Sequence, residues 1–526
     1  MLQKLLSKPN SSYPLITILF TAAAIRLYRI DLPFISPASW RETDTATIAD
    51  NFYRWNWNIF YPAISWNGSE PSFVGYEFQT VTYISAQLYR IFGQHDWVAR
   101  VVAISFGLLS IFALYQLVYR AWDQKHAIIS ATILAIFPGS IYVDRAFLPD
   151  PVMVSLMVTS FWLLVAFLQT ERIRYLIITS LVAMLGILTK ITGIFLGIPI
   201  LYAVITILRR KRPFPIKQAS YIGIAAVIAL IPVVAYYLWA GYVSRTYPPY
   251  HIAAAGNFVW NDGLNQWLEK GYYIRRLYGS LKEFWTYPLM ALVAVGVFLR
   301  PPGSSEASNS NKLPWVFHWW IFAIALYYLI GAKQLIDNPH NLNILHPAAA
   351  ALVARALVVT TAAIHRAVGI KGSIAFLLIT FLIVAGNSYY SLKYWTGSNS
   401  SNYLREGYEL GLALRKVTQP NDLVVTVGPQ IGNPIAIYYS QRKGWTFPPA
   451  WKGVVWWAED DLNDGRKSVS LLKELESKGA KYLGVVHFQK EKIWKNNPEL
   501  AGYIDRTFPQ VQTSESYAIY RIASDK

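Results

Sequence analysis

Four acidic side chains in the first part of the chain have the chemistry of a general base or a metal ligand. Glu42 and Asp44 stand in one short segment, and Glu77 follows in the same polar stretch. Asp150 comes later, directly before a proline. Carboxylates that converge can take a proton from a reacting hydroxyl or bind a divalent cation. Each can equally be a hydrated loop charge or, for Asp150, a helix N-cap. Asp44 and Asp150 are the expected ligands if a metal is bound.

Three further side chains have the chemistry to hold a phosphate. Lys190 interrupts an apolar run, Arg145 adjoins an acidic loop, and His340 follows a proline. A lysine inside an apolar run needs a partner, and an anionic lipid phosphate is one candidate. The alternative is a side chain that extends to the membrane interface. His340 could bind a sugar or phosphate, or could cap a helix. The chain has no cysteine, so disulfides and thiolate metal sites are excluded.

The elements that must position these residues are mostly membrane helices. The chain has 526 residues, of which 54% are hydrophobic and 15% charged, against about 25% charged in soluble proteins. Runs such as residues 127–138 and 152–169 carry almost no charge. A helix needs roughly 20 apolar residues to cross a bilayer. The composition therefore predicts a polytopic α-helical membrane protein.

The net charge of +18 does not indicate a nucleic-acid partner. The basic residues cluster in short links between apolar runs, as in residues 209–212. That distribution is typical of cytoplasmic loops under the positive-inside rule, not of a groove that follows phosphates.

The apolar runs predict about eleven spans with the N-terminus in the cytoplasm, as Lys4 and Lys8 indicate. The spans are expected at residues 13–28, 98–119, 127–142, 152–169, two within 175–202, 221–239, 288–299, 315–330, 344–361 and 373–385. Two large polar segments, 31–96 and 241–287, then lie outside the membrane. Tryptophans suited to the membrane–water interface occur in the first of them, namely Trp40, Trp55, Trp57 and Trp66.

The last part of the chain changes character. Residues 422–428 and 482–488 are short β-rich runs, and residues 468–478 between them have helical periodicity. This pattern predicts a soluble α/β domain over residues 390–526, outside the membrane, after a transmembrane domain over residues 1–389. Trp451, Trp456 and Trp457 crowd one stretch of it, where they could bind sugar rings or anchor the domain on lipid.

In this order the motifs resemble those of the GT-C superfamily of membrane glycosyltransferases. The chain resembles in particular bacterial relatives of protein O-mannosyltransferases and of lipid A aminoarabinose transferase, over roughly residues 15–356. The motifs that carry it are residues 41–49 (RETDTATIA), 92–100, 145–150 (RAFLPD), 188–190 (LTK) and 340–347.

The resemblance implies a sugar donor carried on a polyprenyl phosphate, used on the face opposite the cytoplasm. Asp44 or Glu42 then resembles the base, Glu77 and Asp150 the supporting acids, and Lys190 a phosphate contact. Many relatives have adjacent Asp and Glu where this chain has Arg41 and Glu42. Asp44 lies one helical turn further on, on nearly the same helix face. Glu77 is followed by phenylalanine, where some relatives have a lysine.

We therefore expect an inverting hexosyl or pentosyl transferase of the plasma membrane, acting on a lipid, glycan or protein hydroxyl. The resemblance leaves a divalent metal ion as an open possibility. A transporter or flippase of lipid-linked glycan is the alternative, although such proteins usually carry charges at the midplane and internal repeats. A third reading is a sensor whose terminal domain binds sugar without turnover.

Overall fold

The computed structural model describes residues 13–69, 72–211, 213–250, 267, 271–304, 311–335, 338–396, 402–449 and 462–522. Five residues singled out by sequence lie outside this part of the chain, namely Lys4, Lys8, Trp451, Trp456 and Trp457. The chain divides into two compact units. The helical unit comprises residues 1–30, 100–236 and 254–393, and the sheet unit comprises residues 31–99, 237–253 and 394–526.

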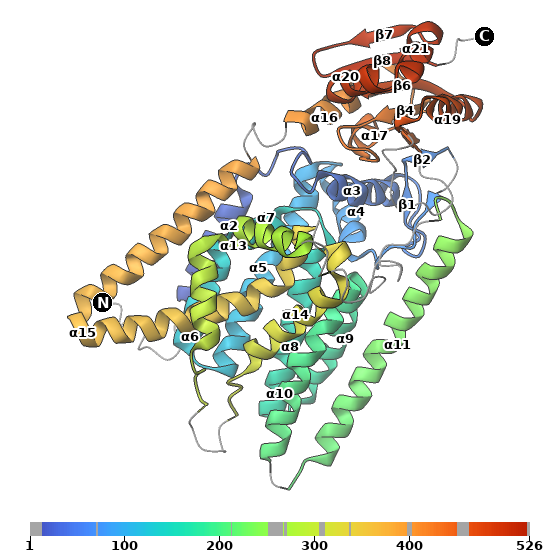
Figure 1. Cartoon of the computed structure of the whole chain (residues 1–526). Coiled ribbons are helices and arrows are strands. Elements are labelled where there is room, and N and C mark those ends of the chain that lie inside the picture. Colours follow the sequence, from blue (N-terminus) through green and yellow to red (C-terminus); the bar gives the residue numbers. More distant parts are fainter. Residues whose placement is uncertain are drawn as a thin grey trace. The chain divides into compact units, whose positions relative to one another are not determined.

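The helical unit consists of apolar helices (Figure 1). They are α2 (Tyr13–Leu27), α5 (Asp96–Ala121, from residue 100), α6 (Gln124–Ile136), α7 (Pro138–Arg145), α8 (Pro149–Thr170), α9 (Ile173–Thr189), η1 (Ile191–Leu196), α10 (Gly197–Arg210), most of α11 (Ile216–Thr246), α13 (Tyr272–Phe298), α14 (Val316–Leu335), η3 (Pro339–Leu345) and α15 (His346–Thr396). Six described helices, or seven with the bent pair α6–α7, are long and apolar enough to cross a membrane. The prediction of a polytopic helical membrane protein is confirmed.

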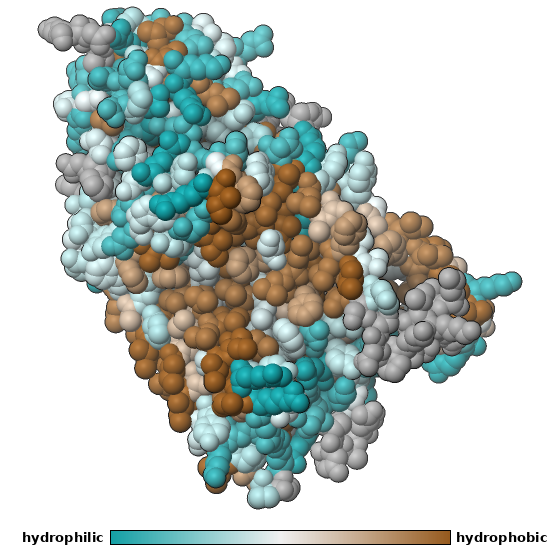
Figure 2. Space-filling view, turned by 180° about the vertical axis from the view of Figure 1, so that it is seen from behind, coloured by the Kyte–Doolittle hydropathy of each residue, from teal (hydrophilic) through white to brown (hydrophobic). Residues whose placement is uncertain are grey.

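Several of these helices expose apolar side chains that the protein itself does not cover. On α11 the side chains of Ile224, Val227, Ile228 and Ile231 are each more than half exposed. Figure 2 shows a broad continuous hydrophobic area on one face of the molecule. By contrast, almost every residue of α8 is buried. Exposed apolar helix faces of this kind suit a hydrocarbon environment.

The bend between α6 and α7 leaves carbonyl groups that helical hydrogen bonds do not fully satisfy. The two helices meet at 61°, and Pro138 at the start of α7 has no N–H to donate. Arg26 of α2 donates to the carbonyl oxygens of Ala135 and Leu134 at 2.9 and 3.4 Å. Ser388 of α15 donates to the next carbonyl oxygen, that of residue 136. Side chains from two other helices therefore satisfy the bend.

Asp144 neutralises Arg26 inside this apolar surrounding. Its Oδ2 accepts from Arg26 Nη2 at 2.8 Å and from Ser140 Oγ at 3.1 Å. Arg26 is 0% exposed and Asp144 is 3% exposed. Gly107 of α5 makes room for the carboxylate, because a Cβ at this position would lie 2.5 Å from Asp144 Cγ. The bend thus depends on a buried ion pair that a glycine accommodates.

The sheet unit combines a six-stranded mixed sheet with helices. Its elements are α3 (Ser39–Arg54), β1 (Ala63–Ile64), β2 (Asn67–Gly68), β3 (Ser72–Phe73), α4 (Thr80–Phe92), α16 (Asn402–Val417), β4 (Leu423–Val427), α17 (Ile435–Ser440), β5 (Gly444–Thr446), α19 (Gly465–Ser477), β6 (Ala480–Val486), α20 (His487–Asn496), α21 (Pro498–Thr507), β7 (Gln510–Thr513) and β8 (Tyr517–Arg521). The strand order is β2-β5-β4-β6-β8-β7. β4 is parallel to β5 and β6, and the other pairs are antiparallel. The expected strands and helix correspond to β4, β6 and α19.

One strand of this sheet comes from the first polar segment. In β2, Asn67 pairs with Trp445 and Gly68 pairs with Gly444 of β5. Gly68 has φ +103°, and a Cβ there would lie 2.9 Å from Trp445 Cζ2. Only glycine fits this backbone and this approach. Sequence patterns placed residues 31–96 in the membrane domain, whereas in the structure residues 31–99 form one compact unit with the C-terminal segment.

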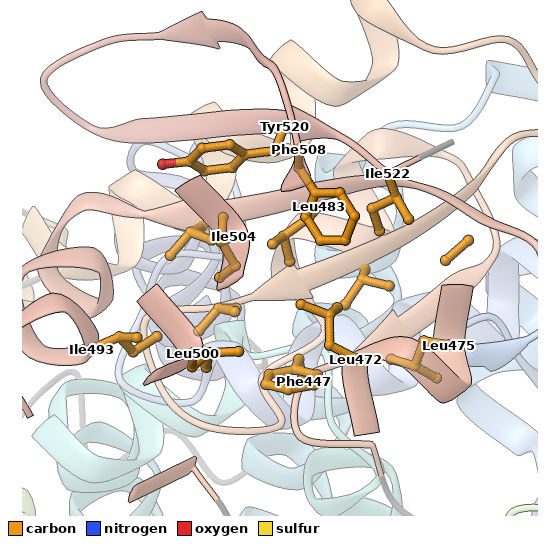
Figure 3. Close-up of a cluster of buried hydrophobic side chains, with 14 of the residues drawn as sticks. Phe447, Leu472, Leu475, Leu483, Ile493, Leu500, Ile504, Phe508, Tyr520 and Ile522 are labelled. Carbon is orange, nitrogen blue, oxygen red and sulfur yellow. The ribbon is translucent and has the colours of Figure 1, made fainter. Parts of the chain in front are cut away.

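The sheet separates two hydrophobic cores, since successive strand residues face opposite sides. Val424 and Ile519 belong to one core, and Val425 and Tyr520 belong to the other. The second core is covered by α19 and α21 through residues such as Leu472, Leu475, Leu500 and Ile504 (Figure 3).

The first core contains side chains both from residues 31–99 and from the C-terminal segment, residues 394–526. Ile48 and Phe52 of α3 pack with Leu410 of α16, Ile437 of α17 and Ile519 of β8. This shared core fixes α3 against the C-terminal segment.

Removal of Arg26 is expected to destabilise the helical unit. Arg26→Ala leaves Asp144 buried without its cation, at a cost of about 3–5 kcal/mol. Thermal unfolding of the detergent-purified protein should show a clearly lowered Tm.

Arg172→Ala, at an exposed arginine, should leave Tm unchanged. A double variant, Arg26→Met with Asp144→Leu, should recover part of the loss because no buried charge remains. An unchanged Tm for Arg26→Ala contradicts this role.

Candidate active site

An acidic cluster lies on α3 in the sheet unit, with Asp44 buried at its centre. Asp44 is 1% exposed. Its Oδ2 accepts a hydrogen bond from Arg41 Nη1 at 3.0 Å, and its Oδ1 accepts one from Trp66 Nε1 at 2.9 Å. Residues three apart share a helix face, so Arg41 and Asp44 meet within one turn. The carboxylate is therefore held at both of its oxygens.

Arg41 connects Asp44 to a second acid. Its Nη2 donates to Glu77 Oε1, and its guanidinium lies 4.9 Å from the centroid of the Tyr76 ring. The side chains of Arg41 and Glu77 are 21% and 14% exposed, against 2% for Asp44. One cation thus bridges two carboxylates, and the accessible part of the cluster is at Arg41 and Glu77.

Burial makes Asp44 a better base than an exposed aspartate. Burial raises the pKa of Asp44 above its usual 3.8, and the negative charge of Glu77 adds to this. Arg41 and the hydrogen bonds from Trp66 and Tyr76 oppose the rise. The pKa of Tyr76 is raised well above 10.0, mainly by burial and then by the charge of Asp44. Tyr76 therefore keeps its proton and donates it to the hydrogen bond with Asp44.

Glu42 lies on the same helix but has a different partner. Its Oε2 accepts from Ser36 Oγ at 2.5 Å, and Glu42 is 1% exposed. Ser36 Oγ also accepts from the Ala38 N–H at 3.1 Å. Glu42 therefore holds the turn before α3 and places negative charge in its first helical turn. The structure joins Asp44 and Glu77 through Arg41 and engages Glu42 in this separate contact.

The helical unit holds a second polar group. Lys190 Nζ donates to Asp150 Oδ1 and to Asn341 Oδ1, both at 2.7 Å. Lys190 lies between α9 and η1, where the chain is extended, and Asp150 lies in the first turn of α8. Asn341 belongs to η3. Three breaks between apolar helices therefore supply the three side chains. The Lys190 side chain is 19% exposed and that of Asp150 is 3% exposed.

The two other expected phosphate-binding residues have different settings. Arg145 ends α7 and donates from Nη1 to the Arg26 carbonyl oxygen at 2.9 Å and to that of Tyr28. Its Nη2 donates to the Arg29 carbonyl oxygen at 3.4 Å. Arg145 thus satisfies carbonyl groups at and beyond the C-terminal end of α2. His340 lies half-buried in η3, next to Asn341.

Sequence patterns did not identify every member of the cluster. Trp66, expected at the membrane interface, is 4% exposed in the core of the sheet unit. Trp66 can be buried there because its indole N–H donates a hydrogen bond to Asp44 and its ring packs among apolar side chains. Sequence patterns also gave no role to Tyr76 or Asn341. In the structure Tyr76 donates a hydrogen bond to Asp44, and Asn341 accepts one from Lys190. No periodicity links Trp66 to Asp44 across 22 positions.

Metal ligands do not gather in the part of the chain that the structure describes. Within it, no group of three or more His, Asp or Glu side chains is placed to hold a metal ion. Asp44 and Asp150, the expected ligands of any metal, belong to different units.

Asp44 is expected to make the stability of the fold depend on pH. A carboxyl whose pKa is higher in the folded state stabilises the fold below its ordinary value of 3.8. That contribution to stability is lost as the pH rises through the higher pKa that the carboxyl has in the folded state. Compared with Asp44→Asn, the unmodified protein should lose stability as the pH rises above the ordinary aspartate pKa of 3.8. Thermal unfolding at a series of pH values measures the difference.

Asp505→Asn is the matched control. Asp505 accepts an indole N–H from Trp494 at 2.9 Å, as Asp44 does from Trp66, but it is exposed. If the difference in Tm between the unmodified protein and Asp44→Asn stays constant as the pH rises, the raised pKa of Asp44 is contradicted.

The chain matches one family of known proteins over part of its length. The family model of dolichyl-phosphate-mannose-protein mannosyltransferases matches residues 80–239. This stretch contains Arg145, Asp150 and Lys190 but not Asp44. No curated protein matches the chain significantly.

Solved structures match it over nearly its whole length. ArnT from Cupriavidus metallidurans bound to undecaprenyl phosphate has a TM-score of 0.64 at 13% identity, covering 98% of this chain and 99% of ArnT. The oligosaccharyltransferase AglB from Archaeoglobus fulgidus, in complex with an inhibitory peptide and a dolichol-phosphate, has a TM-score of 0.58 at 12% identity, covering 97% and 74%. Arabinofuranosyltransferase AftD from mycobacteria has a TM-score of 0.52 at 13% identity, covering 99% and 42%. The resemblance inferred from the motifs is thereby confirmed, and the chain has the fold of the GT-C glycosyltransferases.

Proposed function

We propose that the chain transfers a sugar, with inversion at the anomeric carbon, from a polyprenyl-phosphate donor to an acceptor hydroxyl. The observation that carries this proposal is the buried Asp44 carboxylate, whose pKa is raised while Arg41 and Trp66 hold its two oxygens. A carboxylate with a raised pKa is a stronger base than an exposed one. The undecaprenyl phosphate bound to ArnT and the dolichol-phosphate bound to AglB support a lipid-linked donor.

The proposed reaction balances with these groups. The acceptor oxygen bonds to the anomeric carbon while the bond from that carbon to the phosphate oxygen breaks. The acceptor proton passes to Asp44. The electron pair of the broken bond stays on the phosphate, which gains one negative charge and needs no proton. When Asp44 becomes neutral, Arg41 keeps an anionic partner in Glu77.

Lys190 is proposed as a contact of the donor phosphate. An ammonium group has three N–H donors, and the bonds to Asp150 and Asn341 use two of them. The third is available to an anion. The two partners also orient the ammonium, so it does not have to be ordered when the phosphate binds.

The proposed topology has eleven spans with the N-terminus in the cytoplasm of a plasma-membrane protein. The six long helices, the bent pair and three shorter apolar helices are ten candidates. α15 supplies one more if it is two spans on either side of Gly369, where its helical geometry breaks. An odd number of spans puts residues 390–526 and the transfer reaction on the outer face.

A further proposal is that the reaction requires a divalent cation bound at Asp44. It would compete with Arg41 for Asp44 Oδ2, since both are positive. An oligosaccharyltransferase from Archaeoglobus fulgidus has been solved in complex with Zn and sulfate. Transfer measured after EDTA treatment and after addition of Mg²⁺, Mn²⁺ or Zn²⁺ separates a metal-dependent reaction from one that Arg41 supports alone.

Asp44→Asn should reduce transfer from a polyprenyl-phosphate sugar by roughly 10²–10⁴-fold, the range of a lost general base. Because the base must be ionised, kcat/KM of the unmodified protein should fall on the acid side with a midpoint above 3.8. Glu77→Gln and Glu42→Gln should cost less, because neither takes the proton. The assay uses the purified protein and labelled donor.

Asp505→Asn should leave transfer unchanged. Undiminished transfer by well-folded Asp44→Asn removes Asp44 as the base. A larger loss in Glu77→Gln than in Asp44→Asn assigns the proton to Glu77 instead.

Lys190→Met should raise KM for the donor lipid at least tenfold, and Lys190→Arg should restore part of the affinity because it keeps the charge. Lys211→Met is a matched control. Lys211 also binds one carboxylate and one amide, Glu171 Oε1 at 2.5 Å and Gln218 Oε1 at 2.8 Å. Equal effects of the two methionine variants on KM contradict a donor contact at Lys190.

The flippase alternative predicts movement of the lipid without a new bond. Formation of a glycosidic bond by detergent-solubilised protein, where no membrane barrier exists, decides for transfer. If the protein moves the lipid-linked glycan across vesicle membranes but forms no glycosidic bond with any donor and acceptor tested, the transferase proposal is contradicted.

A further inference from the structure

A cavity of about 270 Å³ lies in the sheet unit, lined mostly by polar and charged residues, and none of the residues assigned above to the chemistry of the transfer reaction lines it. Its wall comes from the end of α3, from the segment around β2 and from residues 420–423 and 437–443. Asp44, Arg41 and Glu77 are not among its lining residues. Its volume is just below the ~300 Å³ lower end for drug-sized ligands. It therefore suits one sugar ring or another small polar group.

Positive charge exceeds negative charge around this cavity. The lining contains Arg54, Arg442 and Lys443 against Asp50 and Asp422. Arg54 Nε pairs with Asp50 Oδ1 at 2.6 Å, so that pair is neutral. Asp422 Oδ1 pairs at 2.9 Å with a lysine that does not line the cavity. Arg442 and Lys443 are left as the excess cations.

Arg442 is held in place by uncharged groups. Its Nε donates to Thr418 Oγ1 at 3.0 Å, and its Nη2 donates to the carbonyl oxygens of Thr418 and Arg415 at 2.9 and 3.1 Å. Burial lowers the pKa of Arg442, and the neighbouring Arg415 and Arg54 lower it further, while Asp422 opposes this. The part that comes from Arg415 and Arg54 reflects cations lying close together, and such a concentration of positive charge attracts an anion.

An exposed indole stands at the same cavity. Trp55, which follows the last residue of α3, is 69% exposed. Lys443 Nζ lies 5.5 Å from the centroid of its ring. In the described part of the chain, Lys443 forms no ion pair with a carboxylate. A large aromatic face and a lysine ammonium are thus presented together, next to hydroxyl and amide groups of Ser65, Ser69 and Asn421.

The backbone holds this arrangement in place before any ligand binds. The Gly444 N–H donates to the Ser65 carbonyl oxygen at 3.0 Å. Directly beyond it, β2 pairs with β5 through Asn67 and Trp445. Lys443 and Ser65 therefore stay side by side. A preformed site loses less conformational entropy on binding than a mobile one.

We propose that this cavity binds an anionic sugar residue, a pyranose ring that carries a carboxylate or phosphate. The anion lies against Arg442 and Lys443, the ring lies against Trp55, and the sugar hydroxyls bond to the serine and amide groups. If the chain is the glycosyltransferase proposed above, the cavity docks a charged unit of the acceptor glycan. The binding itself does not depend on that function.

Calorimetry on the full-length, detergent-purified protein tests the proposal without any lipid donor. The probes are glucuronic acid, glucose 6-phosphate, glucose and inorganic phosphate. Both anionic sugars should bind at least tenfold more tightly than glucose and than inorganic phosphate. Equal affinity for glucose overturns the role of the charge, and equal affinity for inorganic phosphate overturns the role of the ring.

Lys443→Gln should weaken binding of both anionic sugars at least tenfold, and Lys443→Arg should restore most of it. Lys473→Gln is the matched control, since Lys473 Nζ lies 5.2 Å from the ring centroid of Tyr503 and neither residue lines the cavity. Unchanged binding by Lys443→Gln, with Tm unchanged, overturns the site. Trp55→Leu gives a second independent variant and should also weaken binding.

A transfer assay separates this proposal from the proposed function. With an anionic acceptor, Lys443→Gln should raise KM for the acceptor and leave kcat unchanged. Sugar binding without any transfer by the unmodified protein contradicts the transferase and supports the site. Transfer with normal acceptor KM in Lys443→Gln contradicts the docking role and leaves the transferase intact.

Discussion

The core shared by residues 31–99 and the C-terminal segment is the constraint on which the acidic cluster depends. Ile48 and Phe52 bury one face of α3 against α16, α17 and the sheet. Trp66 enters the same core and carries its indole N–H to Asp44. Because interiors are closely packed, neither α3 nor Trp66 can shift without disturbing that core. The geometry of Asp44 is thus set by residues more than 350 positions away.

Two charge pairs of the helical unit join residues of different elements. Arg26 meets Asp144 across the bend between α6 and α7, and Lys190 meets Asp150 between breaks in apolar helices. An unmatched charge in such surroundings costs several kcal/mol, roughly the stability of many whole domains. The breaks in the helices are therefore the places where polar chemistry can exist inside an apolar unit.

The sheet unit carries two electrostatically opposite sites. At Asp44 two carboxylates share one guanidinium, and the balance of burial over attraction raises a carboxyl pKa. At the cavity beside Lys443 the cations are in excess and the carboxylates are already paired. The first arrangement favours accepting a proton, and the second favours holding an anion. Both use α3, one through Asp44 and the other through its last turn at Arg54.

The sequence by itself determined the membrane character, the apolar helices and the strands at β4 and β6, because hydrophobic runs and period-two patterns are local properties. It also marked Asp44, Glu77, Asp150 and Lys190 as polar residues that need partners. Only the tertiary structure decided what those partners are. Trp66 with Asp44, Asn341 with Lys190, and β2 with β5 are contacts across 22, 151 and several hundred positions. No local pattern encodes such pairs, since long-range packing alone brings them together.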